Sequence, residues 1–156
     1  VGNVYKRHDL TFNHINDDNY YEWYKSEYAI FHKNHPKLKD KVTVNSKDIM
    51  EVSLKQNLLK FVEINGETIG LIAGEKSEFL SHTGLYFNEI LISKKWKDKG
   101  IAKAIQRKFI SLFAKEIEYV WGTIDHSNLP SYKTAYSNGR KPVRHECFIR
   151  LGPYKA

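Results

Sequence analysis

The chain has 156 residues, and its 25 lysines and arginines exceed its 18 aspartates and glutamates by a formal net charge of +7. This length fits one domain of residues 1–156, and an apolar content of 41% is too high for a disordered chain. The sequence has no apolar run of about 18 residues that could span a membrane and no signal-peptide pattern at its start. Cys147 is the single cysteine, which excludes disulfides and cysteine-rich zinc sites, so we expect a cytoplasmic protein.

The N-terminal part of the chain predicts two helices separated by a charged loop. Aromatic side chains recur at helical spacing over residues 17–33, where Asp17 or Asp18 is placed to cap the helix. A second, shorter helix is expected over residues 46–56, with Asn45 as its N-cap.

The middle of the chain predicts a hairpin and a third strand. Residues 58–64 and 67–73 flank Asn65-Gly66, which supplies the two positive φ angles that a type I′ turn requires. The third strand is expected over residues 84–93.

A helix and a fourth strand follow this strand. Gly100 precedes the helix, whose apolar side chains recur at i, i+4 spacing from Ile101 to Phe113. The fourth strand is expected over residues 118–124.

The C-terminal part predicts one more helix and one more strand. Asn128 is placed to cap a helix over residues 130–138, and Gly139 stands where a helix-ending glycine belongs. Residues 142–151 alternate apolar and polar side chains, which predicts a last strand with His145 on its core face. The order of elements predicts a mixed α/β or α+β fold with helices on the faces of one sheet.

Positive charge gathers around Gly100. Seven of the fifteen residues 94–108 are lysine or arginine and one is aspartate, so this stretch alone carries a net charge of +6. A helix N-terminus presents unpaired N–H groups and a partial positive charge, and a glycine lets the backbone approach a ligand closely. The pattern favours a pyrophosphate site at this turn; the alternative is a solvated helix face.

Two motifs in this part of the chain resemble the GNAT superfamily of acetyl-CoA-dependent N-acetyltransferases. The run 97–102, Lys-Asp-Lys-Gly-Ile-Ala, is similar to the family signature Gln/Arg-x-x-Gly-x-Gly/Ala between a strand and a helix. Asn128, Ser131 and Gly139 match a second element, Asn-x-x-Ala/Ser with a later glycine. The resemblance covers residues 58–151, and residues 1–57 are expected to form a helical, acceptor-side segment.

The sequence departs from the family pattern at two positions. Lys97 stands where the signature has Gln or Arg, so a donor remains but a two-pronged contact is lost. Ala135 stands where many members place a tyrosine that acts as general acid, and Tyr136 follows it.

The resemblance implies an N-acetyltransferase that moves an acetyl group from acetyl-CoA directly to a primary amine of a small molecule or peptide. It also implies a mixed, mostly antiparallel central sheet with helices on both faces, and an oxyanion donor from the backbone near Leu91 or Ile92. The residues expected to bind acetyl-CoA are Leu91, Ile92, Ser93, Lys97, Asp98, Lys99, Gly100, Ile101, Ala102, Lys103, Asn128 and Ser131.

Glu89 is the candidate general base. It alternates with Leu85, Phe87 and Leu91, which places it on an otherwise apolar face, where desolvation would raise the pKa of its carboxyl group. The alternative is a glutamate paired with a lysine, and a bulge near Asn88 would move Glu89 to the other face.

Other titratable groups have weaker claims to a catalytic role. Tyr136 is the candidate general acid, and His82, Asp125 and His126 are alternatives that could line the same cleft. The pair His32-x-x-His35 has no neighbouring carboxylate or thiolate ligand, so we expect no metal site.

Two other functions stay open on the sequence alone. One is a domain that binds CoA without catalysis. The other is a basic nucleic-acid-binding module that uses Trp96 and exposed tyrosines for stacking, although the charge lies at a strand–glycine–helix junction and not along a groove-reading helix. We expect neither a nucleic-acid nor a membrane partner, and a homodimer stays open.

Overall fold

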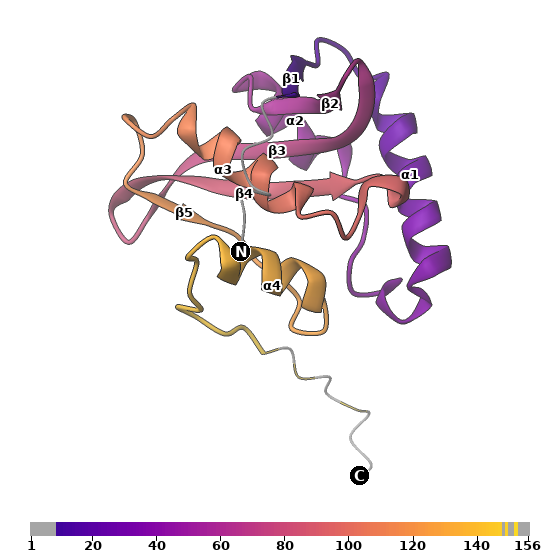
Figure 1. Cartoon of the computed structure of the whole chain (residues 1–156). Helices are drawn as coiled ribbons and strands as arrows, with labels where there is room; N and C mark the ends of the chain where they lie inside the picture. The colour runs from indigo at the N-terminus through magenta and orange to yellow at the C-terminus, as the bar shows by residue number, and fades with distance from the viewer. Residues whose placement is uncertain (1–8, 148, 150–151, 153–156) are drawn as a thin grey trace.

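The computed structural model describes residues 9–147, 149 and 152, which form a five-stranded sheet with helices on both faces (Figure 1). The strands are β1 (Leu10–His14), β2 (Leu59–Ile64), β3 (Glu67–Phe79), β4 (His82–Ile92) and β5 (Tyr119–Trp121). The helices are α1 (Tyr20–Asn34), α2 (Lys47–Lys55), α3 (Ile101–Ser111) and α4 (Leu129–Ser137), with short 3-10 turns η1 (Pro36–Leu38) and η2 (Lys94–Trp96). None of these helices is long and apolar enough to cross a membrane.

The strands lie in chain order across the sheet. Every neighbouring pair is antiparallel except β4 and β5, which run parallel. Asn65 and Gly66 join β2 to β3 with φ angles of 52° and 79°, as the predicted type I′ turn requires. The expected mixed, mostly antiparallel sheet is therefore confirmed.

Each face of the sheet has its own hydrophobic core. On one face, Tyr24 and Tyr28 of α1 and Met50 of α2 pack against β2, β3 and Leu91 of β4. On the other face, the i, i+4 stripe of α3, which includes Phe109, packs against β4 and its neighbours. α1 and α2 thus cover one face of the sheet and α3 covers the other. Side chains of β4 therefore point either toward α1 and α2 or toward α3.

The two ends of the sheet differ from the expectation. β1 was not predicted, because its five residues alternate only weakly; it pairs with β2 from Leu10 opposite Ile64. The predicted last strand is wrong over residues 142–147 and 149, which adopt no regular structure, and His145 is exposed there and not in the core. Residues 148, 150 and 151 of that prediction lie outside the described residues.

Two predicted helix caps are also corrected. The N-cap of α2 is Ser46, whose side chain accepts from the Ile49 N–H, because the Asn45 side chain is turned toward β4 instead. Asn19 precedes α1 without a side-chain cap, and Asp17 accepts a hydrogen bond from the Asn19 N–H at 2.9 Å, ahead of the helix.

A test of the β4–β5 contact uses Gly84, which pairs with Tyr119. A Cβ at Gly84 would overlap the Trp121 ring and lie 2.9 Å from the Tyr119 carbonyl oxygen. We expect Gly84→Ala to lower the free energy of unfolding by about 1–3 kcal/mol, as overpacking does, in urea denaturation. Gly152→Ala is the control, because nothing lies within 4 Å of its Cβ position; equal stabilities of the two variants would contradict the prediction.

Candidate active site

A β-bulge in β4 sets the direction of Glu89. Ala73 of β3 pairs with Glu89 and Gly74 pairs with Phe87, so Asn88 is an extra residue on β4. The bulge moves Glu89 off the α3 face that Phe87 occupies and onto the α1 face. The expectation that Glu89 shares a face with Phe87 is therefore wrong, and the bulge near Asn88 is the reason.

Three hydrogen-bond donors converge on the Glu89 carboxyl group. The hydroxyl groups of Tyr24 and Tyr28 both donate to its Oε2, the latter at 2.8 Å, and the Ile90 backbone N–H donates to its Oε1 at 2.9 Å. Burial raises the pKa of Glu89, while these three bonds, which favour the ionised form, oppose the rise. Glu89 is thus a desolvated carboxylate that is held in one orientation.

The two tyrosines act as hydrogen-bond donors over the whole neutral range. Burial, followed by the nearby Glu89 charge, raises the pKa of Tyr24 and of Tyr28 well above the usual value. Both hydroxyl groups therefore keep their protons. Sequence reasoning missed this pair, although Tyr20, Tyr24 and Tyr28 stand at i, i+4 spacing, a pattern that also describes an ordinary apolar helix face.

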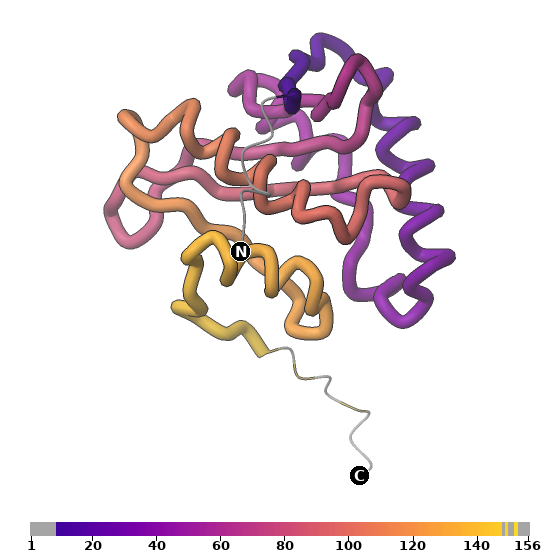
Figure 2. The backbone as a smooth tube through the Cα atoms, in the orientation of Figure 1, coloured from indigo at the N-terminus to yellow at the C-terminus, as the bar shows by residue number. Residues whose placement is uncertain are grey.

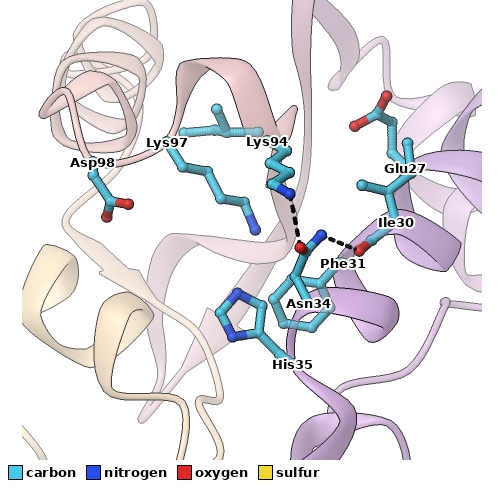
Figure 3. Close-up of a pocket in the computed structure, with 9 residues that line it drawn as sticks. Glu27, Ile30, Phe31, Asn34, His35, Lys94, Lys97 and Asp98 are labelled. Atoms are coloured by element: carbon cyan, nitrogen blue, oxygen red, sulfur yellow. Dashed lines mark hydrogen bonds between the residues drawn. The ribbon is translucent and has the colours of Figure 1, made fainter.

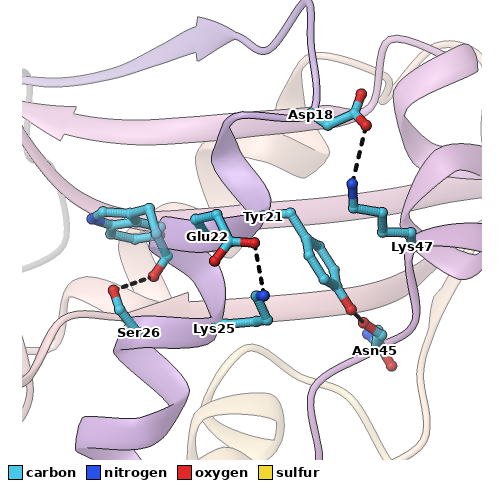
Figure 4. A network of polar contacts seen from close by, with 8 residues as sticks. Asp18, Tyr21, Glu22, Lys25, Ser26, Asn45 and Lys47 are labelled. Carbon is cyan, nitrogen blue, oxygen red and sulfur yellow. Dashed lines mark hydrogen bonds and ion pairs between the residues drawn. The ribbon is translucent and has the colours of Figure 1, made fainter.

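Asn45 fastens the segment before α2 to this network. Its backbone N–H donates to the Tyr24 hydroxyl at 3.1 Å, and its carbonyl accepts from the Tyr21 hydroxyl at 2.9 Å (Figure 4). Its side-chain amide donates to the Asn88 carbonyl oxygen at 2.9 Å, directly at the bulge. The loop between α1 and α2 is thereby held over the carboxylate.

β4 has an open edge beside this carboxylate. β5 pairs with β4 only from Gly84 to Tyr86, and β4 continues to Ile92. The Ser93 N–H donates to the Ile69 carbonyl of β3 at 2.9 Å, and N–H groups alternate between the two edges of a strand. The Leu91 N–H therefore faces β3, and the Ile92 N–H faces the open edge. Of the two positions expected to supply a backbone donor, Ile92 has the suitable direction.

The turn after β4 has the backbone shape that suits an anion. Asp98 and Gly100 both have positive φ angles, 61° and 70°, and the first helical hydrogen bond of α3 runs from the Ala104 N–H to the Gly100 carbonyl. The N–H groups of the first helical turn, which include Ile101 and Ala102, have no partner within the helix and point out of its N-terminus.

The lysines around this turn do not form one surface. Lys97 lies with its Nζ 4.3 Å from the centre of the Phe31 ring, so it points toward α1, and burial lowers its pKa (Figure 3). Lys95 binds the Glu67 carboxylate at 2.9 Å, and Lys99 lies over the Trp96 ring at 4.9 Å.

A groove of about 300 Å³ separates the C-terminal half of α1 from the β4–α3 turn (Figure 3). Lys94 crosses it at one point and donates to the Asn34 side-chain oxygen at 2.8 Å. Ile92, the last residue of β4, lies in its wall, so the groove reaches the open edge of the strand. Its lining residues are Glu27, Ile30, Phe31, Asn34, His35, Ile92, Lys94, Lys97 and Asp98.

The second motif, Asn128 with Ser131 and Gly139, lies at the start and end of α4. The Asn128 side chain accepts from the Ser131 N–H at 3.4 Å and caps α4. Ala135 is buried, whereas Tyr136 is 65% exposed and stacks on Tyr132 with ring centres 6.4 Å apart. The structure therefore places Tyr136 on the outer face of α4, away from the carboxylate network.

Arg140 is a further residue that sequence reasoning missed. Its guanidinium group donates to the Gly122 carbonyl at 3.4 Å and lies 5.6 Å from the centre of the Phe87 ring, where β4 and β5 diverge. Burial lowers the pKa of Arg140, and no carboxylate in the described part of the chain pairs with it.

The alternative acids and bases are engaged elsewhere. Asp125 accepts two hydrogen bonds from Ser127, which lower the pKa of its carboxyl group, and His82 lies 2.9 Å from Glu118 at an exposed position. Among the residues that the structure describes, no group of three or more His, Cys, Asp or Glu side chains is placed to hold a metal ion.

Solved structures, one of them an acetyltransferase, share this arrangement of strands and helices. Naa50 of Arabidopsis thaliana, in complex with the bisubstrate analogue CoA-Ac-MVNAL, has a TM-score of 0.62 at 13% identity over 84% of this chain and 82% of that one. An aminoglycoside acetyltransferase from an uncultured soil metagenomic sample, in complex with sisomicin, has a TM-score of 0.55 at 15% identity, over 92% of this chain and 95% of that one. A mutant of BH1408 from Bacillus halodurans has a TM-score of 0.65 at 13% identity, over 91% of this chain and 98% of that one.

The chain has the GNAT acetyltransferase fold. No protein-family model and no curated protein sequence matches it, so the likeness is one of structure. In this GNAT fold the bulged strand is β4, the glycine turn leads into α3, and the carboxylate network lies on the α1 side.

The hydroxyl–carboxylate contacts make a testable prediction about the pKa of Glu89. Removing one donor to the ionised form should raise that pKa further, so we expect Tyr28→Phe to shift the Glu89 carboxyl titration to higher pH in ¹³C NMR. Tyr20→Phe is the matched control on the same helix, since Tyr20 does not donate to Glu89. A titration that moves to lower pH, or equally in both variants, would contradict the assignment.

Proposed function

We propose that this protein is an N-acetyltransferase that transfers an acetyl group from acetyl-CoA to a primary amine of a small molecule or peptide. The observation that carries the proposal is the position of Glu89. It is a desolvated carboxylate, fixed by Tyr28 and the Ile90 N–H at the bulge of a strand whose neighbouring edge is open. A raised carboxyl pKa suits a group that accepts a proton from an amine near neutral pH.

The turn after β4 fits the phosphates of CoA. Asp98 and Gly100 in the left-handed region aim successive N–H groups outward, and the N-terminus of α3 adds its partial positive charge. The open edge of β4 offers backbone groups for the amide-rich arm that would follow. Asn128 and Ser131, placed among the cofactor contacts by motif, cap α4 and would contribute through the position of that helix.

The chemistry requires one proton acceptor, one oxyanion donor and one leaving thiolate. The amine loses a proton to Glu89, directly or through water, and its nitrogen forms a bond to the thioester carbonyl carbon. The outward N–H of Ile92 is directed to stabilise the oxyanion, after which the carbon–sulfur bond breaks. A thiol has a pKa of about 8.5, so the CoA thiolate can leave without first receiving a proton from a tyrosine. The positive charge of Arg140, which lies where β4 and β5 diverge, would stabilise that thiolate.

The comparisons support the reaction class and leave the acceptor open. One structural relative is an aminoglycoside acetyltransferase and another was solved with a bisubstrate analogue that joins CoA to a peptide, so the fold serves different amines. A nucleic-acid function is less well supported, because Lys95 and Lys108 of the basic stretch are bound to Glu67 and to the Leu10 carbonyl. A CoA-binding domain without catalysis is the remaining alternative.

Gly100 tests the acetyl-CoA site. A valine there is strained by the φ angle of 70° and would fill the space next to the outward N–H groups. We expect Gly100→Val to abolish acetyl-CoA binding in isothermal titration. Gly66→Val carries a similar strain, at φ 79°, in the distant hairpin turn, and should bind as the wild type does. A folded Gly100→Val protein with wild-type affinity would refute the phosphate site.

Glu89 tests catalysis separately from binding. We expect Glu89→Gln to lower kcat by about 10²–10⁴-fold, to remove the acidic limb of the pH–rate profile, and to leave the acetyl-CoA Kd unchanged. The limb should lie above the usual glutamate range, since burial raises the Glu89 pKa and the rate falls as the carboxylate is protonated. Glu63→Gln on β2 is the control.

Three outcomes would count against this assignment. A loss of less than about tenfold with the acidic limb retained would assign the base to water or another residue. Acetyl-CoA binding without turnover on a panel of amines would favour the non-catalytic alternative. A rise in melting temperature with nucleic acid alone would favour the nucleic-acid-binding function.

A further inference from the structure

Part of the α1/α2 face of the sheet lies outside the hydrophobic core. Along β3, the core on this face ends at Ala73. In Figure 2 the β3–β4 hairpin continues beyond this point, and its tip lies at the end of the sheet opposite α1. The side chains of Glu75, Tyr86 and Trp121 belong to neither core, and all three are half-buried. This part of the face is therefore a partly open surface.

Glu75 lies on the same face of the sheet as Glu89. The Asn88 side chain donates to Ser53 of α2 at 3.0 Å and to the Glu75 Oε2 at 3.4 Å, which places the Glu75 carboxylate on the α2 side. Glu89 pairs with Ala73, two residues before Glu75 on β3. Because a strand rises ~3.3 Å per residue, the two glutamates are separated by roughly 7 Å along the strand.

Aromatic rings lie beside Glu75. Tyr86 pairs directly with Glu75 across the β3–β4 ladder, so the two side chains are neighbours on one face. The Trp121 ring lies 6.0 Å from the Tyr86 ring and covers Gly84, where a Cβ would overlap it. A carboxylate next to aromatic rings suits an organic ammonium group, because both the negative charge and the ring faces attract a cation.

The charge of Glu75 is not neutralised by a neighbouring side chain. Among the residues that the structure describes, no lysine, arginine or histidine forms an ion pair with it. Lys76, the next residue on β3, points to the other face, where it pairs with Glu116 and lies over the Phe113 ring. A half-buried carboxylate without a cation favours a positively charged ligand over a neutral or anionic one.

We propose that Glu75 binds a second ammonium group of the acceptor, so that the acceptor is a diamine whose other nitrogen reacts beside Glu89. The rings of Tyr86 and Trp121 line the same subsite. The separation of the two carboxylates along the strand corresponds to a short alkyl chain between the two nitrogens. The inference rests on the proposed function, which supplies the reacting amine, but the subsite itself is tested by binding alone.

The first experiment measures amine binding to the full chain by isothermal titration calorimetry without acetyl-CoA. The probes are 1,4-diaminobutane and 4-amino-1-butanol, which has the same length and a neutral hydroxyl in place of one ammonium group. We expect the diamine to bind about tenfold more tightly, since it forms one more charged hydrogen bond. Equal affinities of the two probes would overturn the proposal.

The second experiment repeats the titrations with Glu75→Gln, which removes the charge and keeps an oxygen for the Asn88 hydrogen bond. We expect this variant to bind the diamine only as tightly as the amino alcohol, with an unchanged circular dichroism spectrum. Glu78→Gln is the matched control and should bind as the wild type does, because Glu78 is exposed on the same strand and points to the opposite face. A Glu75→Gln protein with wild-type affinity for the diamine would refute the subsite.

Turnover with acetyl-CoA distinguishes a failure of the subsite from a failure of the proposed reaction. We expect the wild type to prefer 1,4-diaminobutane to 4-amino-1-butanol in kcat/KM, and Glu75→Gln to reduce that preference about tenfold through KM. Turnover of both amines with equal kcat/KM would overturn the subsite while the acetyltransferase reaction stands. Tight binding of the diamine without turnover of either amine would count against the reaction and leave the Glu75 subsite in place.

Discussion

The extra residue at Asn88 decides on which side of the sheet Glu89 lies. Without the bulge, Glu89 would follow Phe87 toward Phe109 on the α3 face, where an ionised carboxylate without donors is costly to bury. With it, the carboxylate meets the tyrosines of α1. The bulge is in turn held by the Asn88 side chain, which donates to Ser53 at 3.0 Å, so strand, helix and network depend on one another.

Features that depend on neighbouring residues could be predicted from the sequence. The Asn65-Gly66 turn, the apolar stripe of α3, and the Asn128 cap are each decided within a few positions, because φ preferences and side-chain caps act locally. The glycine turn before α3 belongs to the same group. Gly100 was expected at a helix start, and its positive φ angle is the conformation that glycine adopts most readily.

Features that depend on distant partners could not be predicted. Tyr24 and Tyr28 lie 65 and 61 residues from Glu89, and nothing in their spacing distinguishes a hydroxyl that binds a carboxylate from one at a core boundary. Residues 142–147 have strand periodicity, but a strand also needs a neighbouring edge, and periodicity carries no information about one. The same limit hid β1, whose place is set by β2.

Two of the four hydrogen bonds that hold Asn45 use its backbone atoms, through the hydroxyl groups of Tyr21 and Tyr24. Any amino acid except proline offers the same N–H and carbonyl, so most substitutions in the loop before α2 would leave its anchor in place. Such a loop can vary in sequence during evolution while the geometry around the carboxylate stays fixed. Separating a variable loop from a constant framework is one way for a single fold to bind new ligands, and it makes residues 36–44 a natural place to begin redesign.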